Sequence, residues 1–280
     1  MARIEPVTDP RDPRIEPYRA IRERDLVGRQ GLFVAEGRMV LEKLASAGLH
    51  PIRSLLIAKP RLASLEALLD ALPAEVPAYV ADQAVMDAVA GFPMHRGILA
   101  IGERRATSAE ALLAGLAPRA LVVALSAIAN HDNLGGIFRN AAAFGADAVL
   151  LDAACCDPLY RKAIRVSVGA ALITPFARLA AGQDLLGVLD AAGFETVALS
   201  PRGAVELGEL ACGPRAAAVF GAEGPGLAPE LLARSRSVRI GMAHGFDSLN
   251  VATTSGLVLY QLSKSLAKAA DVQADRSPKA

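Results

Sequence analysis

Residues 219–227 read Val-Phe-Gly-Ala-Glu-Gly-Pro-Gly-Leu, an apolar strand that ends in a loop with three glycines. A glycine-rich loop lets the backbone approach a ligand closely, as phosphate and nucleotide loops do. The G-x-x-G-x-G spacing differs from the G-x-G-x-x-G of dinucleotide-binding proteins, and no G-K-[ST] follows. The spacing therefore disfavours a dinucleotide or NTP site and leaves a turn built for packing as the alternative. Glu223, the one acid in this loop, is harder to explain by packing.

A second segment, residues 130–140, reads NHDNLGGIFRN and lies between a predicted strand and a predicted helix. Open α/β sheets hold their ligands at such positions. We expect the helix to begin near Leu134 with Asn133 as its N-cap. Arg139 follows two apolar residues, so it either extends its guanidinium to solvent or meets an anion.

A third segment, residues 240–252, reads IGMAHGFDSLNVA and again joins a strand to a helix. Ser248 or Asn250 can act as the N-cap of that helix. Taken alone this is ordinary capping, but the order and spacing of the three segments are specific when they occur together.

The chain alternates short apolar runs with segments of helical period, which indicates α/β layering. Predicted strands lie at 31–35, 53–58, 77–81, 97–102, 120–125, 147–151, 195–200, 216–221 and 237–242, and a final helix runs from 250 to about 270. The sequence thus predicts an α/β protein with two units. The expected parts are an Arg-rich arm at 1–30, an α/β domain at 31–105, a linker at 106–117, a second domain at 118–270 and a flexible tail at 271–280.

The chain has 280 residues, of which 52% are apolar and 4% aromatic, and it lacks tryptophan. This composition excludes an intrinsically disordered chain and predicts a core packed mainly by aliphatic side chains. The longest apolar run, residues 120–129, is shorter than the roughly 18–20 residues that a bilayer span needs, and the N-terminus shows no secretory signal. We therefore expect a protein without membrane segments that stays in the cytoplasm.

Charge is nearly balanced, with 30 basic and 29 acidic residues, so the whole-chain charge neither favours nor excludes a nucleic-acid partner. Seven arginines lie within the first 29 residues, which form either a local RNA-binding patch or a solvated arm. The three cysteines and four histidines show no C-x-x-C, H-x-x-x-H or H-x-H spacing. The sequence therefore gives no support to a metal site or a disulfide framework.

The three segments together resemble the motifs of the SpoU (TrmH) family of RNA 2′-O-ribose methyltransferases, within the SPOUT superfamily. The matching patterns are N-x5-R from Asn133 to Arg139, F-G-x-E-G-x-G from Phe220 to Gly226, and I-x-M followed by S-L-N-V-A from Ile240 to Ala252. The resemblance covers about residues 118–268. The chain departs from the family pattern in two places, since the usual I-P-M has Gly241 at its centre and the usual N-P-G-N reads N-H-D-N. Gly241 leaves this loop less rigid than proline would.

This resemblance implies an α/β fold whose parallel sheet contains a deep trefoil knot, and a homodimer of catalytic domains. It also implies S-adenosylmethionine as the cofactor, held in the knot mainly by backbone groups of the second and third motifs, with no metal. By matched position, the cofactor contacts are Leu199, Gly221, Ile240 and Leu249. A weaker resemblance at 33–37 and 94–100 implies a small ribosomal-protein-like α/β domain that binds substrate RNA.

The implied reaction is an in-line displacement, in which a ribose 2′-hydroxyl of rRNA or tRNA attacks the sulfonium methyl group. Arg139 matches the catalytic arginine of the family. Because a guanidinium with a pKa above about 12 is a poor base, we expect Arg139 to bind the hydroxyl oxygen or a phosphate and to take the proton only as transfer proceeds. Residues that match positions orienting this arginine or the target nucleotide are Asn133, Glu223, Ser248 and Asn250.

A basic segment around Lys162 resembles a family segment that contacts RNA phosphates. Lys162 and Arg165 lie about one helical turn apart, and Ser167 follows. The alternative is a solvated basic face of a helix. Two other functions stay open, namely an RNA-binding paralogue without turnover and a Rossmann-type oxidoreductase. The complete set of motif residues favours the enzyme over the paralogue, and the glycine spacing disfavours the oxidoreductase.

Overall fold

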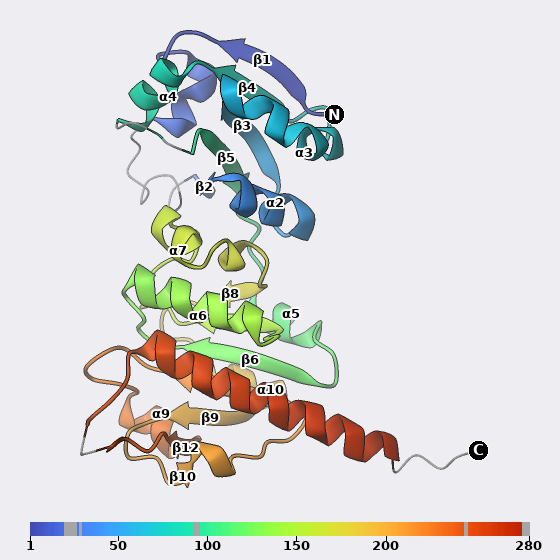
Figure 1. The fold of residues 1–280 in the computed structure, drawn as a ribbon. Helices are drawn as coiled ribbons and strands as arrows, with labels where there is room; N and C mark the ends of the chain where they lie inside the picture. Colours follow the sequence, from blue (N-terminus) through green and yellow to red (C-terminus); the bar gives the residue numbers. More distant parts are fainter. Residues whose placement is uncertain (20–26, 28–29, 92–93, 95, 244–245, 276–280) are drawn as a thin grey trace. The chain divides into compact units, whose positions relative to one another are not determined.

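The computed structural model describes residues 1–275 except 20–26, 28–29, 92–93, 95 and 244–245 (Figure 1). Contacts divide the chain into two compact units. The first unit contains residues 1–105 and 157–173, and the second contains residues 106–156 and 174–280. Among the described residues, no helix is both long and apolar enough to cross a membrane.

The first unit is built on a five-stranded sheet with the order β1-β4-β3-β5-β2. Strands β1, β4 and β3 run parallel to one another, whereas β5 is antiparallel to both β3 and β2. Its strands are β1 (Arg3–Val7), β2 (Leu32–Glu36), β3 (Ile52–Ala58), β4 (Pro77–Ala81) and β5 (Ile98–Glu103). Its helices are η1 (Pro13–Tyr18), α2 (Arg38–Ala47), η2 (Lys59–Leu65), α3 (Glu66–Ala71), α4 (Gln83–Ala90), α7 (Arg161–Val166) and η3 (Ala170–Leu172).

The N-terminal segment belongs to this sheet, so the prediction of a separate Arg-rich arm at 1–30 is wrong for its described part. Strand β1 pairs with β4 along its whole length. Ile15 is 0% exposed, and the Tyr18 hydroxyl forms a 2.7 Å hydrogen bond with the Ser54 hydroxyl in the core. Arg14 contacts Glu5 and Asp12 within the same segment. Several of the early charges are therefore paired at the surface, while the apolar residues between them cover the sheet. The predicted arm residues 20–26 and 28–29 lie outside the described part.

Residues 157–173 pack with the first unit, although the sequence places them inside the second domain. The Arg161 guanidinium contacts Glu36 of β2 at 2.7 Å. The Lys43 ammonium of α2 donates to the carbonyl of Val168 at 2.7 Å. These bonds, with Gly169 packed against the α2 backbone, explain why the segment groups with the first sheet.

The second unit contains a seven-stranded sheet in the order β10-β12-β9-β11-β6-β7-β8, and every neighbouring pair in it is parallel. The strands are β6 (Ala120–Leu125), β7 (Ala148–Leu151), β8 (Phe176–Arg178), β9 (Glu195–Leu199), β10 (Val205–Glu206), β11 (Arg215–Phe220) and β12 (Arg236–Arg239). The helices are α5 (Ala109–Ala114), α6 (His131–Ala143), α8 (Leu185–Ala191), η4 (Leu207–Glu209), α9 (Pro229–Ala233) and α10 (Val251–Asp275).

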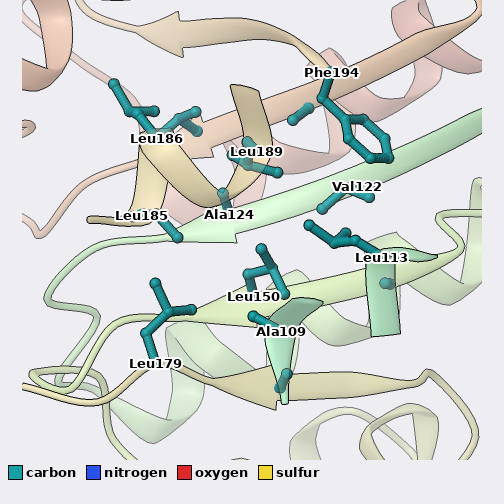
Figure 2. Packing of buried hydrophobic residues seen from close by; sticks show 14 of the residues in the cluster. Ala109, Leu113, Val122, Ala124, Leu150, Leu179, Leu185, Leu186, Leu189 and Phe194 are labelled. Atoms are coloured by element: carbon teal, nitrogen blue, oxygen red, sulfur yellow. The ribbon is translucent and has the colours of Figure 1, made fainter. Parts of the chain in front are cut away.

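The buried core on one face of this sheet lies beneath α5 and α8. Figure 2 shows Leu113 of α5, Leu186 and Leu189 of α8, Val122 of β6 and Leu150 of β7 as members of this buried cluster. The predicted linker at 106–117 is therefore wrong, because it contains α5, whose apolar side is part of this core. Helices α6 and α10 pack against each other on the other face (Figure 1).

Two helix starts settle expectations made from the sequence. Helix α6 begins at His131, and the Asn130 side chain accepts the N–H of Asp132 at 2.8 Å, so Asn133 is not the N-cap. The error arises because two asparagines three positions apart are both good caps, and the first of them is used. Helix α10 begins at Val251 and is capped by Asn250, not by Ser248.

We predict that alanine substitutions of Ile15 and Ile4 have different effects on stability, as expected if the N-terminal segment is packed on the sheet and is not a solvated arm. Ile15→Ala should lower the free energy of unfolding of the first unit by about 2–5 kcal/mol, because it leaves a cavity in the core. Ile4, 41% exposed in β1, is the matched control, and Ile4→Ala should cost less than about 1 kcal/mol. Urea unfolding followed by circular dichroism measures both, and equal small effects would contradict the packing.

Candidate functional site

A cavity of about 1140 Å³ lies where three neighbouring strands of the second sheet end. Because β9, β11 and β12 are parallel, their carboxyl ends meet at one edge, and the segments that follow them form the walls. All four residues predicted to contact a cofactor line this cavity, and they come from the ends of β9, β11 and β12 and the segments that follow: Leu199, Gly221, Ile240 and Leu249. Glu223, Ser248 and Asn250 line it as well.

The glycine loop after β11 folds back on itself and forms one wall. Gly226 N–H donates to the carbonyl of Ala222 at 3.0 Å, and the two residues form an isolated bridge. A Cβ on Gly221 would lie 2.4 Å from the carbonyl carbon of Gly226, so any side chain there would open the loop. Close approach of backbone to backbone therefore explains Gly221. The loop therefore needs glycine at position 221 in order to pack, and the missing side chain also leaves bare backbone facing the cavity.

The Asn250 side chain joins the three motif segments. Its Nδ2 donates to Asn133 Oδ1 of α6 and to Glu223 Oε1 of the glycine loop, both at 2.8 Å. Its Oδ1 accepts the backbone N–H groups of Ala252 and Thr253 at 2.9 and 3.3 Å and so caps α10. Asn133 is 7% exposed, and a buried amide of this kind needs a partner. The sequence-predicted residues Asn133, Glu223 and Asn250 are thus one connected group.

The packing of α6 on α10 depends on residues that the sequence analysis did not select. Asn140 Nδ2 donates to the carbonyl of Ala252 at 2.7 Å and lies 2.9 Å from Ser255 Oγ. A Cβ on Gly136 would lie 2.7 Å from the Cβ of Ala252, so the two helices approach closely there. Gly136 and Asn140 are one turn apart, and this spacing was the available signal for a helix–helix contact.

Asp152, at the end of β7, fixes the segment that leads into α6. Its carboxylate accepts the hydroxyl of Ser126 at 2.8 Å and the N–H of Ala127 at 2.9 Å. Ala127 has a φ of 56°, a strained value for a residue with a side chain, and the carboxylate contacts hold it there. No motif in the chain pointed to this role of Asp152.

Arg139 lies apart from the cavity in a single chain. Its side chain is exposed, it is not among the lining residues, and its guanidinium has no hydrogen-bond or ion-pair partner within the described residues. Arg139 follows Asn133 by six positions. At about 3.6 residues per turn, this separation puts the two on different faces of α6. Of the two sequence-level alternatives for Arg139, the exposed side chain is the one observed in the isolated chain.

The predicted RNA-contact residues have different environments. Lys162 and Arg165 are exposed on α7, as expected for groups that could reach a phosphate. Ser167 is 1% exposed, and its hydroxyl donates to the carbonyl of Ile164 at 3.0 Å. The prediction that Ser167 contacts RNA is therefore wrong for this conformation, because its hydroxyl is buried and engaged at the end of α7.

No group of three or more His, Cys, Asp or Glu side chains that could hold a metal ion occurs in the part of the chain that the structure describes. Cys155 is buried, and burial together with nearby Asp152 raises the pKa of its thiol to about 12. This cysteine therefore stays protonated at neutral pH and is a poor nucleophile.

Comparisons with known proteins identify by sequence the family that the three motif segments resemble. The family described as "SpoU rRNA Methylase family" matches residues 120–260. A protein of Mycobacterium tuberculosis described as an uncharacterized tRNA/rRNA methyltransferase is 39% identical over 271 residues, which cover 94% of this chain and 92% of the relative. A Burkholderia protein described as the 23S rRNA (guanosine-2'-O-)-methyltransferase RlmB is 30% identical over 186 residues, covering 65% of this chain and 74% of the relative.

Solved structures share the fold. The crystal structure of an AdoMet-bound rRNA methyltransferase from Sinorhizobium meliloti has a TM-score of 0.81 at 24% identity and covers 94% of this chain and 98% of that chain. The SpoU methyltransferase AviRb from Streptomyces viridochromogenes, in complex with AdoMet, has a TM-score of 0.77 at 22% identity, with coverage of 91% and 98%.

We predict that Asn250→Ala lowers the free energy of unfolding of the second unit by about 1–3 kcal/mol. The substitution removes the cap of α10 and leaves the buried Asn133 amide without its donor. Ser248→Ala is the control, since Ser248 is exposed and does not cap the helix, and it should change stability by less than about 0.5 kcal/mol. Chemical denaturation of both variants decides between them, and a larger loss for Ser248→Ala would reverse the assignment of the cap.

Proposed function

Because this chain belongs to the SpoU rRNA methylase family, we propose that it transfers the methyl group of S-adenosylmethionine to a ribose 2′-hydroxyl of structured RNA, either rRNA or tRNA. The observation that carries the proposal is the connected group Asn133–Asn250–Glu223, of which Glu223 and Asn250 line a large cavity. All three segments that the family resemblance singles out meet there. The named relatives support an RNA substrate, and the RlmB relative supports the 2′-oxygen as acceptor.

The residues of the cavity fit S-adenosylmethionine. Leu199, Ile240 and Leu249 supply apolar walls for an adenine ring, and the glycine loop supplies bare backbone for close contact. Glu223 and Asp247 place negative charge in the lining, which suits a ligand that carries a sulfonium and an ammonium group. We propose that these residues hold the cofactor and that no metal ion takes part.

When bound, S-adenosylmethionine supplies an activated methyl group, so this chain has to align the acceptor and manage one proton. The carboxamide of Asn250 holds Glu223 and Asn133 at fixed positions beside the cavity, and these groups can orient the target ribose. Ser248 lines the same cavity with an exposed hydroxyl and can contact the target nucleotide. Arg139 binds the hydroxyl oxygen or the adjacent phosphate; because the charged guanidinium has no site for a further proton, the hydroxyl proton passes to solvent as the methyl group is transferred.

Arg139 lies outside the cavity lining, so bringing it to the reacting hydroxyl requires movement of its side chain or a second copy of the chain. We propose a homodimer of the second unit, as the family resemblance implies. Leu257 and Tyr260 support this, because these α10 side chains are 44% and 47% exposed and a second copy would cover them. We also propose the trefoil knot of the family, which the fully parallel sheet and the fold shared with the AviRb structure support.

We predict that Arg139→Ala abolishes methyl transfer. The variant should keep the free energy of unfolding of the wild type, and its cofactor affinity should stay within twofold of the wild-type value. Arg139→Lys should also fail, since a point ammonium cannot reproduce the planar fork of the guanidinium. Transfer of labelled methyl groups to rRNA and tRNA from a strain that lacks the gene measures activity, and calorimetry measures cofactor binding.

The control for this experiment is Arg119→Ala, which removes an arginine that precedes β6 at the amino edge of the sheet and should keep normal turnover. Near-normal activity of either Arg139 variant would remove Arg139 from the mechanism. Cofactor and RNA binding by the wild type without any methyl transfer would instead support a non-catalytic RNA-binding paralogue.

We predict that the double variant Lys162→Ala/Arg165→Ala weakens RNA binding and makes it less sensitive to salt. Each lost phosphate contact should lower the slope of log affinity against log salt by about 0.7–0.9, so the pair should lower it by about 1.4–1.8. Arg53→Ala, which removes an exposed arginine of β3 in the same unit, is the control and should change the slope by less. Filter binding at several salt concentrations gives the slopes, and equal slopes for the two variants would leave α7 as a solvated basic face.

A further inference from the structure

The side chain of Glu206 holds the backbone that follows β12, the segment from which Ile240 lines the cavity. The backbone N–H of Gly241 donates to Glu206 Oε1 at 2.9 Å. Glu206 ends β10, the two-residue strand that pairs with β12 at the edge of the sheet. The segment between β12 and α10 is therefore tied to a residue that precedes it by 35 positions in the sequence.

Glu206 is itself held by Arg239, the last residue of β12. Arg239 Nε lies 3.2 Å from Glu206 Oε2, and its Nη1 donates to the carbonyls of Gly203 and Ala204 at 2.8 and 3.1 Å. Gly203 is packed so closely that a Cβ there would lie 2.2 Å from the Val238 carbonyl carbon. These contacts join the segment after β9 to the end of β12.

Both joined segments line the cavity. Ser200, Pro201 and Arg202 come from the segment after β9, and Ile240 and Met242 flank Gly241. A glycine gives its segment little rigidity of its own, so the position of Ile240 depends on what holds the backbone beside it. The bond from Gly241 to Glu206 removes that freedom at the centre of the segment.

We propose that Glu206 is a positioning residue for the cofactor, which fixes the Ile240–Met242 backbone through the N–H of Gly241 and is itself oriented by Arg239. The inference rests on the proposed function, since it takes S-adenosylmethionine as the occupant of the cavity. In the protein without cofactor, Glu206 already restricts the Ile240–Met242 segment to the conformation that binds the cofactor.

The test is a double-mutant cycle with S-adenosylhomocysteine as the probe. Glu206→Ala should weaken binding of this probe about three- to tenfold, the range for losing one partly exposed hydrogen bond to a carboxylate. Glu206→Gln keeps an acceptor and should lose less. Glu209→Ala is the matched control, because it removes an exposed carboxylate three positions later in η4, and its affinity should equal that of the wild type.

Gly241→Pro removes the N–H that Glu206 accepts. The φ of Gly241 is outside the left-handed region, and a Cβ there would lie 3.4 Å from Glu206 Oε1, an ordinary contact distance, so the position tolerates a side chain. In the Gly241→Pro background, Glu206→Ala should change affinity less than twofold. An equal loss in both backgrounds would show that Glu206 acts on general stability, and that result would overturn the proposal.

Hydrogen exchange gives a second readout that does not depend on the proline variant. In the free protein, the amide of Gly241 should exchange faster in Glu206→Ala than in the wild type or in Glu209→Ala. Unchanged exchange and unchanged affinity in Glu206→Ala would contradict the positioning role. Failure of the wild type to bind S-adenosylhomocysteine would instead contradict the proposed function.

Discussion

The Asn250 carboxamide connects segments that are otherwise far apart in the sequence. Each of its two polar atoms makes two contacts, so it caps α10, partners the buried Asn133 and holds Glu223. An amide that uses its donor and acceptor capacity in this way fixes its own rotamer, since any rotation breaks several bonds at once. The start of α10, the first turn of α6 and the glycine loop therefore have one relative arrangement, and the cavity takes its shape from it.

The parallel sheet provides the frame for this junction. Its strands all end at one edge, so residues that follow β9, β11 and β12 meet there although they are tens of positions apart. Around the edge, polar side chains fix irregular backbone: Asp152 holds the entry to α6, and Glu206 with Arg239 holds the exit from β12. Each carboxylate accepts backbone N–H groups that no strand or helix satisfies. The cavity thus consists of loops with little regular structure whose conformations are set by side chains.

The sequence predicted what depends on local pattern. The alternation of apolar runs with helical segments indicated the α/β class, whereas the residues that meet at the cavity were predicted from the resemblance of three segments to the SpoU family motifs. It failed where two local signals were equivalent, as with Asn130 and Asn133, which are both good N-caps. It failed also for β1, because a short, charged strand at the edge of a sheet carries little hydrophobic pattern. The bond from Gly241 to Glu206 and the burial of Ser167 depend on tertiary packing, which no spacing in the chain encodes.

The central claim is that this site methylates the 2′-oxygen of a ribose in cellular RNA. The most direct measurement maps 2′-O-methylated nucleotides by mass spectrometry in rRNA and tRNA from a strain without the gene, from its parent and from the deletion strain carrying the wild-type gene. We expect the deletion strain to lose 2′-O-methylation at a defined nucleotide and the restored gene to return it. An unchanged set of 2′-O-methyl groups, or the loss of a methyl group from a base in place of a ribose, would contradict the account.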